Sequence, residues 1–237
     1  MPMLIKAVFF DMGSTLVYDT GLRRNFVEKL YEKLGKNYNV SREELEKLFN
    51  LWDFVPYREG EEEYWDLFRV MLLLKRLGIS PAPHLVNSVY KTIVEIWVES
   101  YQIEENAAST VKKLKNNGFK IGIISNAGSY DSVYGELEKA NLLNYIDVVI
   151  VSQAVIWKKP SPQIFRIALD MVGVKPFEAV HVGDDPVADI KGAKKAGLWT
   201  IQKLRKDREI SPFADFAIEK ISEVPEVIEE IIGEKLP

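Results

Sequence analysis

The sequence predicts an α/β protein in which a doubly wound parallel sheet carries a smaller, all-helical domain. From residue 105 onward, short apolar runs alternate with helical patterns of roughly ten residues, and this alternation is typical of parallel βαβ units. Residues 17–101 instead show long patterns with the helical period of about 3.6 residues. We therefore expect two domains in this chain of 237 residues: an α/β core formed by 1–16 and 102–237, and a helical domain formed by 17–101.

The first strand of the core is predicted at residues 7–10. This run of apolar and aromatic residues ends at Asp11 and at a Gly-Ser-Thr turn, residues 13–15, and such boundaries are typical of a buried strand. The segment that follows has a helical pattern, so the strand must pair with strands that come later in the chain. Asp11 is then expected at the point where a buried strand emerges.

Four helices are expected in the helical domain. The first is indicated by apolar side chains at helical spacing: Leu22, Phe26, Leu30 and Leu34. Ser41 and Glu44 form a capping box at the start of the second, and the others are placed at about 61–77 and 83–99. We interpret the acidic run within 59–63 as the solvated start of the third helix. The segment holds 14 of the 26 aromatic residues, which either form its core or line a pocket.

The remainder of the chain alternates between the two kinds of element. Strands are expected at 120–125, 148–151, 179–182 and 199–202, with an edge strand at 215–218. Helices are expected at 107–117, 129–140, 162–172, 187–196 and 224–232. Sheets of this kind bind ligands beyond the carboxyl ends of their strands, so the residues at those ends are the first candidates for a functional site.

Composition excludes several classes of function. The formal net charge is −4 and the basic residues are scattered, which argues against binding to nucleic acid. We find no apolar run near the ~20 residues of a membrane helix and no leader peptide, so we expect a cytoplasmic protein that does not bind membranes. The absence of Cys excludes disulfides and thiolate chemistry, and two His residues argue against a catalytic triad or a His-rich metal site. Carboxylates, Lys, Ser and Thr must carry any chemistry.

Polar residues of these types follow the predicted strands. They are Asp11 after the first strand, Ser125 and Asn126 after the second, Lys158 and Lys159 before Pro160, and Asp184, Asp185 and Asp189 after the strand at 179–182. Two carboxylates ~4 Å apart repel by about 4 kcal/mol at an effective dielectric constant of 20, so converging aspartates require a cation. Oxygen ligands favour Mg²⁺, which binds through a few carboxylates and substrate phosphate. Lys and Ser would neutralise and hold the phosphate, and Asp11 could attack phosphorus to form an aspartyl phosphate.

In this order and at these strand ends, the motifs resemble those of the haloacid dehalogenase superfamily. The matching segments are Asp11-x-Gly13-Ser14-Thr15-Leu16, Ser125-Asn126, Lys159-Pro160 and Gly183-Asp184-Asp185-x-x-x-Asp189. The resemblance implies a Rossmann-like core with a helical cap, and an enzyme that hydrolyses a small phosphorylated substrate. It also implies roles. Asp11 is the nucleophile and a Mg²⁺ ligand together with Asp184, Asp189 and the backbone carbonyl of Gly13, while Thr15, Ser125 and Lys159 hold the transferring group.

One position departs from the pattern of the resembling phosphatases. They usually carry a second Asp as general acid where this chain has Gly13. Loss of a general acid typically costs about 10²- to 10⁴-fold in rate, so alkyl phosphates are expected to be poorer substrates than aryl or acyl phosphates. The superfamily's dehalogenases and phosphonate hydrolases also lack this Asp, and both remain alternatives. A phosphonate hydrolase would need a cap lysine, with candidates at Lys29, Lys33, Lys47 and Lys75.

A protein of another class is a further alternative. A non-catalytic protein could keep the metal and phosphate site without turnover. A signalling receiver is disfavoured because its acidic pair should precede the phosphorylated Asp, whereas here the acidic cluster comes last. Among the remaining residues, we interpret Asp185 as an N-cap or a supporting group, His181 as a buried structural residue and Lys158 as a surface residue. Asn126 either contacts substrate or forms the turn. The sequence leaves the substrate and the oligomeric state open.

Overall fold

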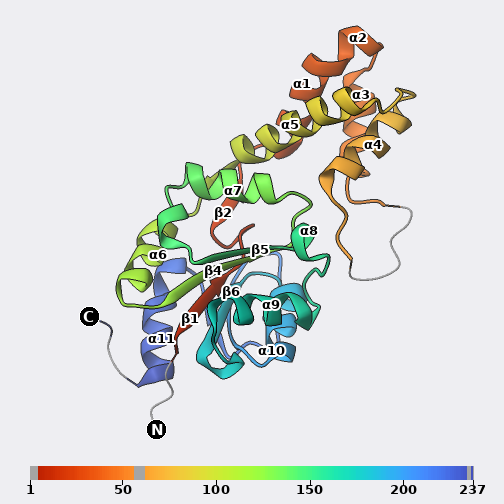
Figure 1. The fold of residues 1–237 in the computed structure, drawn as a ribbon. Coiled ribbons are helices and arrows are strands. Elements are labelled where there is room, and N and C mark those ends of the chain that lie inside the picture. The colour runs from red at the N-terminus through yellow and green to blue at the C-terminus, as the bar shows by residue number, and fades with distance from the viewer. Residues whose placement is uncertain (1–4, 56–61, 234–235, 237) are drawn as a thin grey trace.

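The α/β fold class is confirmed by a computed structural model that describes residues 5–55, 62–233 and 236 (Figure 1). Its main sheet has six strands in the order β5-β4-β1-β6-β7-β8, and every neighbouring pair is parallel. The strands are β1 (Ala7–Phe10), β4 (Lys120–Ser125), β5 (Val148–Val151), β6 (Ala179–Gly183), β7 (Trp199–Lys203) and β8 (Phe216–Ile218). The first strand is therefore central, between the strands on which the later polar motifs lie.

Helices cover both faces of this sheet (Figure 1). They are α6 (Ala107–Asn116), α7 (Tyr130–Lys139), α8 (Ser152–Val155), α9 (Pro162–Val172), η4 (Pro186–Lys191), α10 (Gly192–Ala196) and α11 (Val224–Ile232), with short turns η2 (Leu143–Tyr145), η3 (Pro176–Glu178) and η5 (Ile221–Glu223). Val8 and Phe10 of β1 pack with α6, α7 and α11, whereas Ala7 and Phe9 pack with α9 and α10. This alternation is the period of two expected of a strand that is buried on both faces.

The expected helical segment after β1 is present. Its helices are α1 (Leu22–Leu30), η1 (Tyr31–Gly35), α2 (Lys36–Tyr38), α3 (Arg42–Asn50), α4 (Asp66–Arg76) and α5 (Pro83–Ser100). They share a hydrophobic cluster of their own, which includes Phe26, Leu30 and Leu45. The predicted capping box is confirmed, because Ser41 accepts from the N–H of Glu44 while the Glu44 side chain accepts from that of Ser41. We refer to these helices as the cap helices.

A second, two-stranded sheet was not expected from the sequence. β2 (Val17–Asp19) and β3 (Tyr101–Ile103) pair antiparallel where the chain leaves the core and where it returns. The predicted boundaries at 16/17 and 101/102 fall on this pair of strands, and the division into two domains there stays a prediction. β2 and β3 have three residues each and lie at the borders of a segment with a helical pattern, which is why the sequence did not indicate them.

The third cap helix begins later than the acidic run suggested. α4 starts at Asp66, and residues 59 and 61 of the run lie outside the described residues. The interpretation of Glu63 as solvated was wrong, because it is buried and its carboxylate lies 2.7 Å from the guanidinium of Arg69. An acidic run looks the same in sequence whether it faces solvent or a distant arginine.

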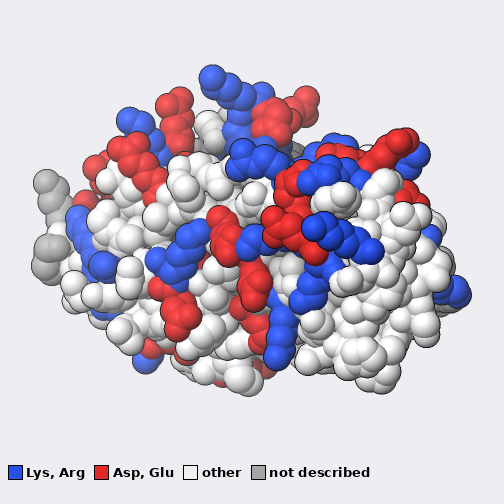
Figure 2. All heavy atoms as spheres, turned by 90° about the horizontal axis from the view of Figure 1, so that it is seen from above, with Lys and Arg blue, Asp and Glu red and all other residues white. Residues whose placement is uncertain are grey.

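The surface has no extended area of a single charge on the face seen in Figure 2. Basic and acidic side chains are interspersed across it, in keeping with 31 basic and 35 acidic residues. No helix in the described ranges is long and apolar enough to span a membrane.

Candidate active site

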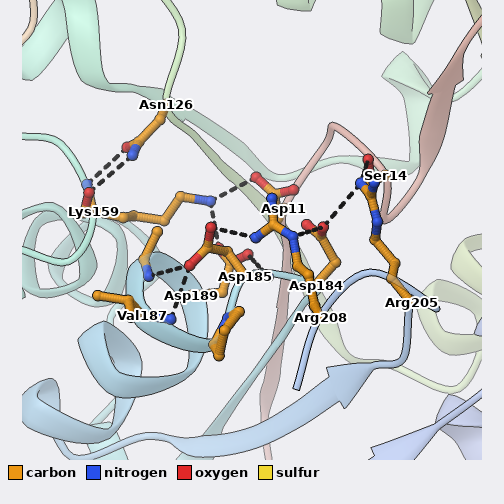
Figure 3. Close-up of polar contacts among 12 residues, drawn as sticks. Asp11, Ser14, Asn126, Lys159, Asp184, Asp185, Val187, Asp189, Arg205 and Arg208 are labelled. Atoms are coloured by element: carbon orange, nitrogen blue, oxygen red, sulfur yellow. Dashed lines mark hydrogen bonds and ion pairs between the residues drawn. The ribbon is translucent and has the colours of Figure 1, made fainter. Parts of the chain in front are cut away.

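Three strand ends bring the predicted polar residues together. β1 pairs with β4 on one side and with β6 on the other, so the residues that follow these strands share one edge of the sheet. Asp11, Asp184 and Asp189 are all buried, and one carboxylate oxygen from each lies within 4.8 Å of the others. The close-up in Figure 3 shows them converging together with Lys159. This convergence follows from parallel topology, because it places all carboxyl ends at the same edge.

Lys159 connects two of these carboxylates (Figure 3). Its side chain is almost fully buried, and its Nζ donates to Oδ1 of Asp11 and Oδ1 of Asp189, both at 2.6 Å, and to the carbonyl of Ile124 at 2.8 Å. These contacts occupy the three N–H groups of an ammonium. Lys159 therefore compensates part of the negative charge and fixes the orientation of Asp11.

Asp189 is held from further sides. Nε2 of His181 lies 3.1 Å from its Oδ1, and the backbone N–H of Asp185 donates to its Oδ2 at 3.0 Å. The Asp185 side chain accepts from the backbone N–H groups of Val187 and Ala188, at 2.8 and 2.7 Å, which confirms its expected role as an N-cap. His181 is fully buried as expected, although its Nδ1 has no partner within the described part of the chain.

Electrostatics separate the protonation behaviour of the carboxyl groups. Burial raises the pKa of Asp11 against the opposing attraction of Lys159, with further increases from Asp189 and Asp184. Burial also acts to raise the pKa of Asp189, but the interactions with Lys159 and His181 outweigh it. The pKa of Asp189 is therefore held below the usual range. Burial and then Asp189 raise the pKa of Asp184. The negative charges of the cluster therefore disfavour the ionised forms of Asp11 and Asp184. A cation bound between these two carboxylates would lower their pKa values again.

The donor set fits a divalent metal. Three carboxylates with oxygens this close to one another form a hard, all-oxygen cluster of the kind that Mg²⁺ takes. Lys159 alone compensates only part of that charge, and Arg205 and Arg208 contribute from the edge, with nitrogens 3.4 and 3.6 Å from Oδ2 of Asp184. The three carboxylates could thus hold a metal. The resemblance-based assignment of the Gly13 carbonyl as a further ligand stays a prediction.

The side chain of Asn126 contacts the backbone of Lys159. Its Nδ2 donates to the carbonyl of Lys159 at 2.9 Å, and its Oδ1 accepts from the N–H of Lys159 at 2.7 Å. The side-chain amide of Asn126 thus holds the backbone of Lys159, the catalytic candidate, through two hydrogen bonds (Figure 3). A direct contact between Asn126 and substrate stays a prediction, and the structure adds this positioning interaction.

Ser125, Gly13 and Thr15 differ in their surroundings. Ser125 and Gly13 line a cavity that reaches from the turns after β1 and β4 to the cap helices. Thr15 is fully buried, and its hydroxyl has no hydrogen-bond partner among the described residues. A Cβ at Gly13 would meet no atom within 4 Å, so the space beside this residue is open.

The cavity has a volume of about 490 Å³ and is shared by the core and the cap helices. Phe49, Trp52, Trp97 and Tyr101 contribute aromatic surface to its wall. Phe26 contacts Phe49 and Trp52 edge to face, with ring centroids 5.2 and 5.6 Å apart. Aromatic residues of the cap helices therefore contribute both to the hydrophobic core of the cap and to the wall of the cavity. Lys158 is partly exposed and also lines the cavity.

A buried ionic cluster joins the cap helices to the loop after β4. Arg69 of α4 donates to Glu63 and to Asp66, each at 2.7 Å. The N–H of Asp66 donates to the carbonyl of Gly128 at 2.6 Å, and Oγ of Ser152 lies 3.2 Å from Glu63. We call Glu63, Asp66 and Arg69 the latch cluster. It closes one side of the cavity.

Sequence reasoning missed the latch cluster and one buried acid, Glu136 of α7. Glu136 lines the cavity and is 8% exposed. A signal existed for both, because Asp66 and Arg69 precede Val70 on one face of α4, and Glu136 lies on the apolar face of α7. Charged residues within an apolar stripe are candidates for buried pairs or functional groups.

Comparisons with known proteins agree with this architecture. The model of the haloacid dehalogenase-like hydrolase family matches residues 8–203. A glyceraldehyde 3-phosphate phosphatase of Methanopyrus kandleri is 30% identical over 96% of this chain and 99% of its own length. Among solved structures, a HAD phosphatase from Thermococcus onnurineus has a TM-score of 0.74 at 26% identity, covering 98% of this chain and 100% of its own. A 2-haloacid dehalogenase from Pseudomonas syringae pv. Tomato DC3000 has a TM-score of 0.78 at 22% identity, covering 96% and 99%, which shows the fold alone.

Proposed function

The chain belongs to the haloacid dehalogenase-like hydrolase family and is a phosphatase-type hydrolase, and we propose that it is Mg²⁺-dependent and transfers phosphate from a small metabolite to Asp11. The observation that carries this proposal is the convergence of Asp11, Asp184, Asp189 and Lys159 at a sheet edge whose adjoining loops line a cavity. A nucleophile, a cation site and a fixed ammonium are the parts that phosphoryl transfer needs.

The reaction begins with Asp11. Its free carboxylate oxygen attacks phosphorus, the bond from phosphorus to the leaving oxygen breaks, and water then hydrolyses the aspartyl phosphate. Lys159 holds the other oxygen of Asp11 at 2.6 Å and so directs the attacking one. Ser125, Thr15 and backbone N–H groups of the turn after β1 would hold the phosphate oxygens. Mg²⁺ bound by Asp11, Asp184, Asp189 and the carbonyl of Gly13 would supply charge neutralisation for the phosphate.

The charges of the cavity favour a substrate whose leaving group carries no second negative charge. Three lining carboxylates, Asp53, Glu63 and Asp66, outnumber the two lining cations, Arg69 and Lys158, and burial raises the pKa of the fourth lining acid, Glu136, to about 8. One of the basic residues, Arg69, is already paired with Glu63 and Asp66. A carboxylate on the substrate would therefore meet acidic walls. We propose an uncharged, hydroxyl- or carbonyl-bearing leaving group, for which the similarity to glyceraldehyde 3-phosphate phosphatases provides glyceraldehyde 3-phosphate as the first compound to assay.

The same observations weigh against the alternatives. A 2-haloacid brings a carboxylate that needs a cationic partner, and dehalogenation has no use for a cluster of three carboxylates that calls for a metal. A phosphonate hydrolase would need a lysine in the cavity, but the only lysine among its described lining residues is Lys158 of the core, and none of the four cap candidates is there.

The proposal is tested with p-nitrophenyl phosphate. Hydrolysis should require added Mg²⁺ and stop with a chelator, and Asp11→Asn should lower kcat by at least about 10³-fold because it removes the nucleophile. Asp170→Asn, an exposed aspartate on α9, is the matched control and should keep activity. Full activity in chelator, or in Asp11→Asn, would contradict the mechanism. Binding of Mg²⁺ and vanadate without turnover would favour the non-catalytic alternative.

A further inference from the structure

Phosphate transfer from an alkyl ester leaves an alkoxide, which is a poor leaving group unless it is protonated as the bond breaks. Gly13, two residues beyond Asp11, has no side chain to supply that proton, and the space around it is open. The proton donor must then come from another element that reaches the same cavity. This question rests on the proposed function.

Glu136 is an acid that faces this cavity from the core. It lies on α7, the helix that follows directly from the Ser125–Gly128 loop and is capped by Ser129, whose side chain accepts from the N–H of Ser132. Ser132, Val133 and Glu136 line the cavity along one face of the helix, and Gly13 and Ser125 line it from the neighbouring turns. Glu136 therefore lines the same cavity as Gly13 and Ser125, and it is near enough to Asp11 for the charge of Asp11 to raise its pKa.

The helix that carries Glu136 is held firmly in place. α5 packs on α7 (Figure 1), and a Cβ at Gly135 would come within 2.6 Å of Val98. Lys139, one turn after Glu136, donates through Nζ to the carbonyls of Val98, Glu99 and Tyr101 at 2.8, 3.2 and 2.8 Å. The ammonium that could have paired with Glu136 is thus engaged with the end of α5.

The environment keeps a proton on Glu136. Burial raises the pKa of its carboxyl to about 8, Lys139 lowers it in part, and the negative charge of Asp11 raises it further. Tyr101 of β3 also faces it and, with its own pKa raised to about 12 by burial, stays neutral. Across the cavity, Arg69 is neutralised by Glu63 and Asp66. A carboxyl group that is protonated near neutral pH and that lines a cavity has the properties of a general acid.

We propose that Glu136 is the general acid and base of this enzyme, occupying the chemical role for which Gly13 has no side chain. When an oxygen of Asp11 bonds to phosphorus and the ester bond breaks, the carboxyl proton of Glu136 passes to the leaving oxygen and an alcohol departs. The resulting carboxylate then takes a proton from the attacking water. Cleavage of the bond between Asp11 and phosphorus releases inorganic phosphate and restores both side chains.

The first test compares leaving groups. Glu136→Gln should lower kcat/KM for glyceraldehyde 3-phosphate by about 10²- to 10⁴-fold but kcat/KM for p-nitrophenyl phosphate by less than about tenfold, because kcat/KM reports formation of the aspartyl phosphate and nitrophenolate leaves in that step without a proton. Glu138→Gln, an exposed glutamate on the same helix, should change neither. Equal losses on both esters, or no loss on the alkyl ester, would overturn the assignment. A wild-type enzyme inactive on both esters would instead contradict the proposed function itself.

Two further readouts distinguish chemistry from structure. The wild-type profile of kcat/KM against pH for the alkyl ester should fall above about pH 8, and this fall should be absent for the aryl ester. Gly13→Asp should raise alkyl-ester turnover more in the Glu136→Gln background than in the wild type, because the new carboxyl has open space at that position. If Glu136→Gln does not fold, the wild-type profiles decide: parallel profiles for the two esters overturn the proposal.

Discussion

At the scale of single residues, Lys159 is the group whose position matters most to the candidate site. It is buried between two carboxylates and a carbonyl, with all three distances between 2.6 and 2.8 Å. Although burial alone would lower the pKa of Lys159, Asp11 and Asp189 raise it above its ordinary value. The lysine therefore stays charged between its two carboxylate partners.

Lys159→Met is expected to destabilise the protein by about 3–5 kcal/mol, because it leaves buried carboxylates without their partner. The free energy of unfolding in urea, measured without added metal, checks this. Lys158→Met is the matched control. It removes the neighbouring, half-buried ammonium and should have a much smaller effect. Equal destabilisation by the two variants would contradict the role assigned to the buried ion pairs.

At the scale of elements, the loop after β4 joins the candidate site to the cap helices. Ser125 and Asn126 face the site, while the carbonyl of Gly128 accepts from the N–H of Asp66 at the start of α4. Only a glycine fits at 128. A Cβ there would lie 2.0 Å from Nη1 of Arg69 and 2.1 Å from Oδ1 of Asp66, and both atoms are fixed in the latch cluster. The site loop and the start of α4 are therefore in direct contact.

Gly128→Ala should push the latch cluster away from this loop. We expect a destabilisation of about 1–3 kcal/mol, as is usual for an overpacked buried site, together with a raised KM for p-nitrophenyl phosphate, because the cavity wall moves. Thermal unfolding and steady-state kinetics measure the two effects. Gly13→Ala serves as the control for stability, since its Cβ meets nothing within 4 Å. Unchanged stability and KM in Gly128→Ala would show that the contact is not needed.

At the scale of the whole molecule, Glu136 makes stability depend on pH. Its pKa is about 8 in the folded protein against 4.5 for an ordinary glutamate. Between these values the folded state holds a proton that the unfolded chain has released. Rising pH therefore costs the folded state stability across this window. A buried carboxyl with this cost is easier to explain by function than by structure.

Glu136→Gln should remove that pH dependence. Relative to the wild type, the variant should gain stability progressively as the pH rises from about 5 to about 9, because Gln has no proton to lose. Urea unfolding at several pH values measures this difference. Glu138→Gln, exposed on the same helix, should run parallel to the wild type. Parallel curves for Glu136→Gln as well would mean that the buried carboxyl titrates normally.

The sequence alone was sufficient for the fold class and for the set of residues at the strand ends. Apolar runs that alternate with helices imply a parallel sheet, and a parallel sheet places its carboxyl ends together. Asp11, Ser125, Lys159, Asp184 and Asp189 could therefore be gathered without coordinates. The short strands β2 and β3 and the late start of α4 were missed, because β2 and β3 lie at the borders of a segment with a helical pattern and because charge runs do not reveal their partners.

Only the tertiary structure decided which polar residues away from the strand ends belong to the site. Glu136 and Arg69 lie on helices whose pattern is the same whether a face meets the core or a cavity. Their neighbours come from segments far away in the sequence: Gly13 lines the same cavity as Glu136, and Gly128 lies against Arg69. Helical periodicity predicts which face of a helix is buried, but packing across the chain determines what that face touches.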